Sequence, residues 1–374
     1  MSALEAMWWR EQEPAGARAL LAPLALAEAI FRAGAALRAG LYRAGLLAAE
    51  RAGAPVISVG NLAVGGAGKT PAAIAVARRL QSRGRRVAVL SRGYRATRRE
   101  ARVVSDGRRV LLGAADAGDE PLLLARRLPG AAVLCGPRRA PLARRAVEAL
   151  GADALVLDDG FQHRALWRDL DLVVLDAANP FGNGRLLPRG PNREGLGALD
   201  RAGLAWLSRV DQAAPDALGR LRALAAAATG RPPVESRHAA VDVVDGGGGR
   251  SFGPAALAGR RVLLLAALAR PGGFRRTVEG MGASVAAVRF FRDHHLFTDG
   301  ELEEAFAAGR AAGCDQVVAT EKDAVRLPAR WAGEGMLRVV RIEAEVVRGE
   351  EILAEALDRA LAAWPSAAPR GGPR

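Results

Sequence analysis

Residues 56–71 read VISVGNLAVGGAGKTP, and this stretch decides the fold. Its apolar opening is typical of a short buried strand, and a loop containing Gly65, Gly66 and Gly68 leads into a helix expected from Thr70 to Arg83. Glycines leave room for backbone N–H groups to close around phosphate oxygens, and the helix N-terminus adds the positive end of its dipole. The stretch therefore predicts a phosphate-binding loop.

This loop predicts the contacts of a nucleoside triphosphate. Lys69 would reach the β- and γ-phosphates, and the Thr70 hydroxyl would bind Mg²⁺. Ala63 stands where the strict loop pattern has glycine. The residues expected to bind ATP are Ala63, Val64, Gly65, Gly66, Ala67, Gly68, Lys69 and Thr70.

Lysine is rare in this chain. Of 54 basic residues only Lys69 and Lys322 are lysine, and the rest are arginine. A position that keeps lysine against this bias is expected to need a compact ammonium rather than a planar guanidinium. Lys322 has a structural alternative, because Thr320 and Asp323 have the spacing of a helix capping box.

From residue 55 onward, predicted strands alternate with predicted helices, as is typical of a doubly wound parallel sheet in an α/β protein. Breaks in composition at 230–233 and 246–249 indicate a second, smaller α/β domain. The predicted organisation is an N-terminal amphipathic helical segment over 1–50, a P-loop NTPase-like domain over 51–230, the smaller domain over 235–364 and a disordered tail over 365–374.

Acidic residues lie at the ends of two of these predicted elements. Asp158 and Asp159 end the strand in ALVLDDG (154–160), where a carboxylate could hold Mg²⁺ beside the phosphate loop, although a turn or helix cap would look the same. Asp119 in AGDEP (117–121) begins a predicted helix, so it fits either a catalytic role or an ordinary helix cap.

Two further motifs carry polar side chains. FRDHH (291–295) holds His294 and His295, and paired histidines serve metal binding, acid–base chemistry or neither. NPFGNGRLLPRGPNRE (179–194) is rich in glycine and proline. Its arginines Arg185, Arg189 and Arg193 predict binding of an anionic substrate group, or alternatively a solvated basic loop.

Composition and charge exclude several classes of protein. The 374 residues contain two cysteines, which excludes a disulfide scaffold, and no apolar run approaches the about twenty residues of a spanning helix. The net charge is +14, and residues 78–109 hold twelve arginines against two acids. This excess indicates an anionic partner, or else an arginine-rich background composition.

The N-terminal segment predicts an amphipathic helix. Leu26, Ile30, Leu37 and Leu41 share one face, Arg32 and Arg43 lie opposite, and Trp8 and Trp9 precede the stretch in the sequence. Such a helix either lies in a membrane interface or packs on the protein's own core.

The chain resembles the tetraacyldisaccharide 4′-kinase family, the lipid A 4′-kinases of Gram-negative bacteria. The resemblance runs in family order from about residue 55 to 330. It rests on SVGNLAVGGAGKTP, SRGYR (91–95), GDEP (118–121), LDDGFQHRAL (157–166), NPFGNGRLLPRGPNRE, ARPGGF (269–274), DHH and TEKDAVRL (320–327). The family usually has Ser or Thr at position 63, and Asn192 and Gly195 also depart from its pattern.

The resemblance implies phosphorylation, by ATP with Mg²⁺, of the 4′-hydroxyl of a tetraacylated glucosamine disaccharide 1-phosphate. It implies a peripheral protein on the cytoplasmic face of the bacterial inner membrane, where the anionic lipid surface is a partner. It also implies a catalytic Asp–His pair, assigned by motif to Asp119 and His294, with His295 as the fallback. No nucleic acid partner is expected. The oligomeric state does not follow from the sequence, and a monomer is the working expectation.

Two other functions fit part of the sequence. A phosphate-loop ATPase could drive transport, and phosphate incorporation into lipid would distinguish a kinase from it. A nucleic-acid-binding ATPase would use the arginines of 78–109, but only Tyr94 is interleaved there, which gives little base stacking.

Overall fold

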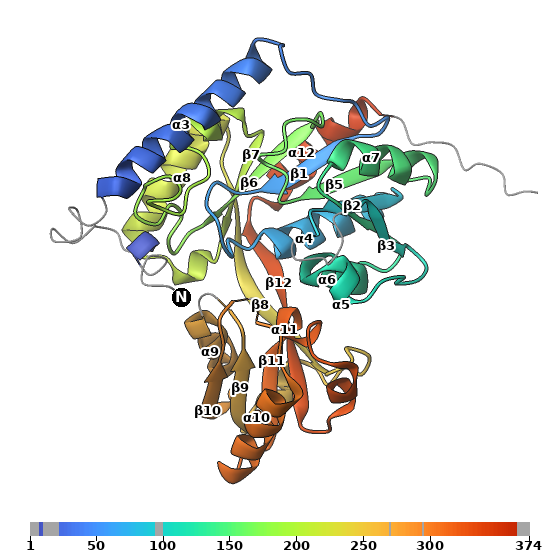
Figure 1. Cartoon of the computed structure of the whole chain (residues 1–374), viewed down its shortest axis with the longest axis vertical. Helices are drawn as coiled ribbons and strands as arrows, with labels where there is room; N and C mark the ends of the chain where they lie inside the picture. Colours follow the sequence, from blue (N-terminus) through green and yellow to red (C-terminus); the bar gives the residue numbers. More distant parts are fainter. Residues whose placement is uncertain (1–6, 10–21, 94–99, 269–270, 294, 365–374) are drawn as a thin grey trace, which may run out of the picture. The chain divides into compact units, whose positions relative to one another are not determined.

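The computed structural model describes residues 7–9, 22–93, 100–268, 271–293 and 295–364, and the chain forms two compact units. The larger unit comprises residues 2–237 and 344–374, and the smaller unit comprises residues 238–343. The chain enters the smaller unit within β8 (Val234–Asp245) and leaves it within β12 (Leu337–Arg348) (Figure 1).

One boundary of the predicted domains needs correction. The sequence analysis assigned residues 235–364 to the smaller domain, but residues 344–364 belong to the larger unit. The reason is the last helix, α12 (Glu350–Ala362), which contacts β1 and β6 of the larger unit. Its carboxylates Glu350 and Asp358 also accept hydrogen bonds from Arg79 and Arg83 at 2.7 Å.

The larger unit is built on a mostly parallel sheet in the order β8-β7-β6-β1-β5-β2-β4-β3, as the sequence predicts. Among the described strands of this unit, only β3 and β4 pair antiparallel. Its other strands are β1 (Val56–Gly60), β2 (Val87–Ser91), β3 (Arg102–Asp106), β4 (Ala132–Cys135), β5 (Ala154–Asp158), β6 (Leu170–Asp176) and β7 (Leu204–Ser208).

Helices connect these strands on both faces of the sheet. The crossover through α4 (Lys69–Ser82) runs from β1 to β2, and that through α7 (Arg139–Glu148) runs back from β4 to β5. Because such crossovers are right-handed, opposite directions place the two helices on opposite faces (Figure 1). The remaining helices of this unit are α3 (Ala22–Arg43), α5 (Ala114–Ala117), α6 (Asp119–Arg127) and α8 (Pro215–Thr229), with 3₁₀ turns η1 (Leu196–Arg201) and η2 (Val210–Gln212).

The smaller unit has a parallel arrangement of its own, in the order β10-β9-β11-β12. Phe306 and Leu302 of its helix α10 are buried against Leu263 and Val317 of the strands. The elements are β9 (Arg261–Ala266), β10 (Ser284–Phe290), β11 (Gln316–Thr320), α9 (Pro271–Gly280), α10 (Asp299–Ala311), α11 (Glu321–Ala324), η3 (Pro254–Leu257) and η4 (Ala329–Gly333).

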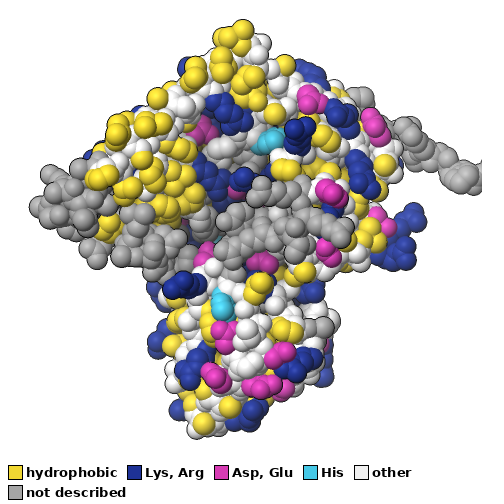
Figure 2. Space-filling view, viewed as in Figure 1, with side chains coloured by type: hydrophobic (Ala, Val, Ile, Leu, Met, Phe, Trp, Pro, Cys, Tyr) yellow, Lys and Arg dark blue, Asp and Glu magenta, His cyan; other side chains and the backbone are white. Residues whose placement is uncertain are grey.

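Helix α3 turns its apolar face outward. Leu26, Ile30 and Leu37 are 68%, 67% and 66% exposed, and Figure 2 shows hydrophobic side chains gathered over this helix. Its polar Glu28, in contrast, is buried and accepts a hydrogen bond from the Leu186 backbone N–H at 3.0 Å. The described residues therefore leave this face without the core contacts of the second alternative. No helix among them has the length and apolar character to cross a membrane.

Trp206 of β7 is a large side chain in the core of the larger unit. Its ring is fully buried, and its indole Nε1 donates to Ser236 Oγ at 2.7 Å, so both the apolar ring and the polar N–H are satisfied. Trp206 is among the largest fully buried side chains of the described residues.

We expect Trp206→Ala to lower the free energy of unfolding by about 3–5 kcal/mol, because it leaves a cavity and an unsatisfied hydroxyl. Urea unfolding followed by circular dichroism measures this loss. Trp167, which is 45% exposed, supplies the control, and Trp167→Ala should cost less than about 1 kcal/mol. Equal losses in the two variants would contradict the prediction.

Candidate active site

The carboxyl ends of the parallel strands bring the candidate site together. β1 lies between β5 and β6, with Val59 in register with Asp158 and Gly60 with Val173. The loop after β1 therefore emerges beside the carboxylates that end β5, as expected for ligand sites at the carboxyl edge of such sheets.

The predicted phosphate loop leads directly into α4. Gly68 precedes the helix with φ +85°, a left-handed conformation that favours glycine, and Lys69 is the first helical residue. Gly65 and Gly66 are exposed, so their backbone is accessible to a ligand. The ammonium of Lys69 donates to Gly65 O at 3.1 Å and lies 3.7 Å from Asp159 Oδ1.

Asp159 is held between two cations. Besides Lys69, the Arg193 guanidinium donates to both of its carboxylate oxygens at 2.9 Å. Burial alone would raise the pKa of Asp159, but the charges of Lys69 and Arg193 lower it to about 2. Asp159 also has φ +53°, unusual for a residue other than glycine, and the surrounding contacts hold it there.

Asp158 has a different environment. It is buried at the end of β5, and Ser91 Oγ donates to its Oδ2 at 3.3 Å, while no donor among the described residues bonds its buried Oδ1. Burial, followed by the charges of Glu120 and Asp159, raises the pKa of Asp158 to about 7. A cation at this oxygen would satisfy both its hydrogen-bonding capacity and its charge.

These residues fit a Mg²⁺ ion. Mg²⁺ is commonly bound through one or two carboxylates together with substrate phosphates, and Asp158, Asp159 and the Thr70 hydroxyl are the oxygen donors expected at this edge. The buried Oδ1 of Asp158 is the observation that favours a cation here. When bound, Mg²⁺ would compensate negative charge on the phosphates.

Arg193 connects three sequence motifs. It bonds Asp159, and it also donates to Gln162 Oε1 at 3.1 Å, while Gln162 Nε2 donates to Asn61 O at 2.9 Å. Backbone bonds from Val64 N to Pro191 O and from Arg193 N to Leu62 O, both 2.8 Å, join the phosphate loop to the end of the 179–194 loop.

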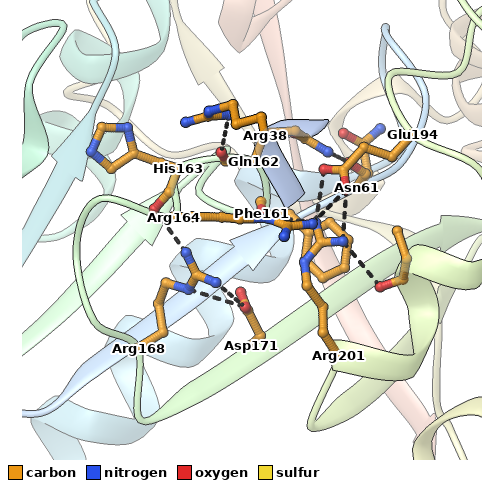
Figure 3. Close-up of polar contacts among 11 residues, drawn as sticks. Arg38, Asn61, Phe161, Gln162, His163, Arg164, Arg168, Asp171, Glu194 and Arg201 are labelled. Atoms are coloured by element: carbon orange, nitrogen blue, oxygen red, sulfur yellow. Dashed lines mark hydrogen bonds and ion pairs between the residues drawn. The ribbon is translucent and has the colours of Figure 1, made fainter. Parts of the chain in front are cut away.

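Half-buried ion pairs lie next to this junction (Figure 3). Glu194 accepts from Arg164 at 3.1 Å and from Arg201 at 2.7 Å, and the Arg201 guanidinium lies 3.7 Å from the Phe161 ring centroid. His163, which follows Gln162, lies to one side of this cluster (Figure 3). Burial, followed by the charge of Arg139, lowers the pKa of His163 to about 4, so His163 is neutral at pH 7.

The other two arginines of the 179–194 loop do not join the cluster around Asp159. Arg185 is exposed, and its carbonyl accepts from Asn192. Arg189 pairs with Glu28 of α3 at 3.9 Å. The family departure Asn192 is buried and donates to Phe181 O at 2.8 Å, so it holds the loop in shape.

Three residues at the carboxyl ends of β6 and β7, Asp176, Ser208 and Arg209, were not predicted from the sequence. Ser208 Oγ donates to Ala67 O at 2.7 Å, and Arg209 Nη2 donates to Gly66 O at 2.6 Å. Arg209 also pairs with buried Asp176 and has φ +56°. Because C=O and N–H point in opposite directions across a trans peptide, holding these carbonyls turns the following amides the other way. In the sequence, the only signal for these three residues was their position at the end of a strand predicted to be buried.

Asp119 does not cap its own helix. Gly118 is the N-cap residue of α6, and no side chain caps this helix, so the capping alternative for Asp119 fails. Asp119 lies one residue before Glu120, whose charge acts on Asp158. The GDEP motif thus belongs to the same edge of the sheet as the phosphate loop.

The histidine motif belongs to the smaller unit, and His294 lies outside the described residues. The ring of His295 bonds Glu301 at 2.9 Å and stacks on Phe291 with centroids 4.8 Å apart. Thr298 and His295 lower the pKa of Glu301 to about 2, as expected for a carboxylate that accepts these hydrogen bonds. The His295 ring is therefore engaged by side chains of the smaller unit.

The TEKDAVRL motif is structural too. Thr320 caps α11 by accepting from Asp323 N, as its spacing predicts, and buried Asp323 pairs with Arg326. Arg326 donates to His295 O at 3.2 Å, so the motif supports the DHH turn. Lys322 lies 3.6 Å from Asp293.

Arginines from the 78–109 run make contacts within the larger unit. Besides the pairs with α12, Arg85 donates to Trp364 O at 3.0 Å, and Arg102 pairs with Asp116 at 3.0 Å. These four arginines of the run are therefore paired within the larger unit itself.

Comparison with known proteins identifies the relatives of this chain. The family model described as Tetraacyldisaccharide-1-P 4′-kinase matches residues 17–362. The chain belongs to the tetraacyldisaccharide-1-P 4′-kinase family. It is 69% identical over 362 residues to the tetraacyldisaccharide 4′-kinase of Anaeromyxobacter sp. (strain Fw109-5), covering 97% of both chains.

More distant members of the tetraacyldisaccharide-1-P 4′-kinase family agree. A tetraacyldisaccharide 4′-kinase of Geobacter metallireducens is 41% identical, covering 83% of this chain and 89% of that protein. The crystal structure of LpxK from Aquifex aeolicus in complex with ATP is similar with a TM-score of 0.74 at 28% identity, covering 92% of this chain and 99% of that one. The resemblance of the motifs is thereby confirmed.

We expect Lys69→Arg to lose most of the turnover, because a wide guanidinium cannot replace the ammonium between Gly65 O and Asp159. Phosphate transfer from radiolabelled ATP measures this loss. Lys322→Arg, at the other lysine of the chain, is the matched control and should stay close to the unaltered protein. Full activity in the Lys69→Arg protein would show that the retained lysine is not required.

Proposed function

We propose that this chain transfers the γ-phosphoryl group of ATP to the 4′-hydroxyl of a tetraacylated disaccharide 1-phosphate, the step that forms lipid IVA in lipid A biosynthesis. The observation that carries the proposal is the family match over residues 17–362, together with a phosphate loop beside buried Asp158 and half-buried Asp159. An assay with ATP and the lipid disaccharide 1-phosphate, reading 4′-phosphorylation, tests it. ATP hydrolysis without lipid phosphorylation would favour the transport ATPase instead.

In this mechanism the larger unit holds the nucleotide. The backbone N–H groups of the phosphate loop bind phosphate oxygens, and Lys69 meets the transferred group. Lys69 then exchanges its contact with Gly65 O for the phosphate. Arg193 keeps Asp159 ionised and oriented, so its negative charge is retained beside Lys69.

Asp119 is proposed as the base that accepts the proton of the sugar hydroxyl. Its position supports this role, because it starts α6 next to Glu120 and does not serve as the helix cap. His294 is proposed as its partner rather than His295, since the His295 ring is already engaged by Glu301 and Phe291. Phosphoryl transfer then needs alignment and charge compensation more than covalent work by the protein.

The outward face of α3 supports a peripheral place on the cytoplasmic side of the inner membrane. Exposed Leu26, Ile30 and Leu37 would enter the lipid, while Glu28 stays buried on the protein side. The acylated substrate resides in the same lipid. Anionic headgroups would attract a chain of net charge +14.

We expect Asp119→Asn to lower kcat about 10²–10⁴-fold while ATP affinity stays nearly unchanged, because general-base removal leaves the phosphate contacts intact. If His294 acts only through Asp119, the double variant Asp119→Asn/His294→Ala should be little worse than Asp119→Asn. Steady-state kinetics and calorimetry measure the two quantities.

Asp116→Asn is the control for this series, since Asp116 is a neighbouring carboxylate that pairs with Arg102 and is half exposed. It should keep kcat near the unaltered value. A fully multiplicative double variant would contradict a pair acting as a unit, and an unaffected kcat in Asp119→Asn would remove Asp119 from the chemistry.

We expect serine at Leu26, Ile30 and Leu37 together to abolish most binding to anionic vesicles, because the apolar contribution to membrane binding comes from these side chains. Vesicle sedimentation at low and high salt measures binding, and salt should weaken it in the unaltered protein. Serine at Val110, Leu111 and Val347, which are exposed apolar residues off α3, is the matched control. Equal vesicle binding by both triple variants would refute the assignment.

A further inference from the structure

We propose that Trp9 is a positioning residue for the phosphate loop, brought there by a seat that the 179–191 loop forms for the N-terminal Trp8–Trp9 pair. The inference rests on the proposed function, because it assigns a further residue to the same nucleotide site. It also gives the glycine-rich part of the 179–194 motif a role other than substrate binding.

The seat binds the backbone of the tryptophan pair specifically. The Asn183 backbone N–H donates to Trp8 O at 2.7 Å, and the Asn179 side-chain amide donates to Trp9 O at 3.0 Å. In return, the Trp8 indole donates to Pro188 O at 3.1 Å. Two consecutive carbonyls and one indole are therefore fixed by a single loop, which is more than a chance apolar contact would provide.

Gly182 makes this close approach possible. A Cβ atom at position 182 would lie 2.3 Å from Trp8 O, far inside van der Waals contact, and Gly182 has φ +58°. Only glycine accommodates both the conformation and the neighbour. The NPFGNG sequence thus leaves room for the Trp8–Trp9 segment that it binds.

The ring of Trp9 reaches the phosphate loop. Its Cζ2 atom lies 3.4 Å from the position that a Cβ of Gly65 would occupy, so the edge of the indole lies beside Gly65, within about one methyl group of it. Gly65 has φ +97°, and its carbonyl accepts from the Lys69 ammonium. The indole thus supports the peptide next to the ammonium that is proposed to meet the transferred phosphoryl group.

This packing has an energetic consequence. Gly65 and Gly66 bring no side chains of their own and are conformationally permissive, so ordering them around phosphate costs entropy. Ser208 and Arg209 hold the loop by its carbonyls, and the Trp9 indole lies beside Gly65, where it limits the space open to the loop. A loop ordered before the nucleotide arrives binds it more tightly, because less freedom is lost on binding.

The test compares Trp9→Ala and Trp9→Phe in the full chain. The dissociation constant for adenylyl imidodiphosphate with Mg²⁺, measured by calorimetry without lipid, should rise about tenfold in Trp9→Ala. It should stay within about twofold in Trp9→Phe, which refills the space with a flat ring. The midpoint of thermal unfolding should remain close to that of the unaltered protein, because a purely structural role would lower it without changing affinity.

Fluorescence supplies a second readout. The analogue should change the tryptophan emission of the unaltered protein and of Trp167→Phe, whose indole is half exposed and stacks with Arg51. The change should be lost in Trp9→Phe. Its persistence there, or unaltered affinity in Trp9→Ala, overturns this inference alone. If the unaltered chain fails to bind the analogue, the proposed function fails first.

Discussion

Parallel pairing of β1 with β5 on one side and β6 on the other fixes where the charged groups of the larger unit lie. This backbone pairing alone places the start of the phosphate loop beside Asp158 and Asp159. The two carboxylates then differ in their partners: Asp159 remains ionised between Lys69 and Arg193, while no cationic side chain among the described residues bonds buried Asp158. One backbone arrangement therefore gives two adjacent carboxylates different chemical properties.

The sequence predicted this edge well because its signals are local. A strand, a glycine loop, a lysine and a following helix are contiguous, and so are a strand and its two terminal acids. Ser208, Arg209 and Asp176 were missed for the opposite reason. They act on the loop from across the sheet, and nothing in their own neighbourhood distinguishes them from the ends of ordinary buried strands.

Long-range pairing also explains the other differences. Arg185, Arg189 and Arg193 look equivalent in the sequence, yet only Arg193 bonds Asp159, while Arg189 pairs with a carboxylate of α3. The return of α12 to the larger unit depends on Glu350 and Asp358 meeting arginines about 270 positions earlier in the chain. Charge complementarity over such separations cannot be predicted from periodicity, which reports only neighbours along one element.

The exposed apolar face of helix α3 affects how this protein associates with itself in water. Contiguous apolar surface on a water-soluble chain promotes self-association, whatever the sign of the net charge elsewhere. Leu26, Ile30 and Leu37 line such a surface, and the described residues do not cover it. We therefore expect detergent or lipid that shields this helix to improve the colloidal stability of the purified chain more than the charge repulsion among its arginines does.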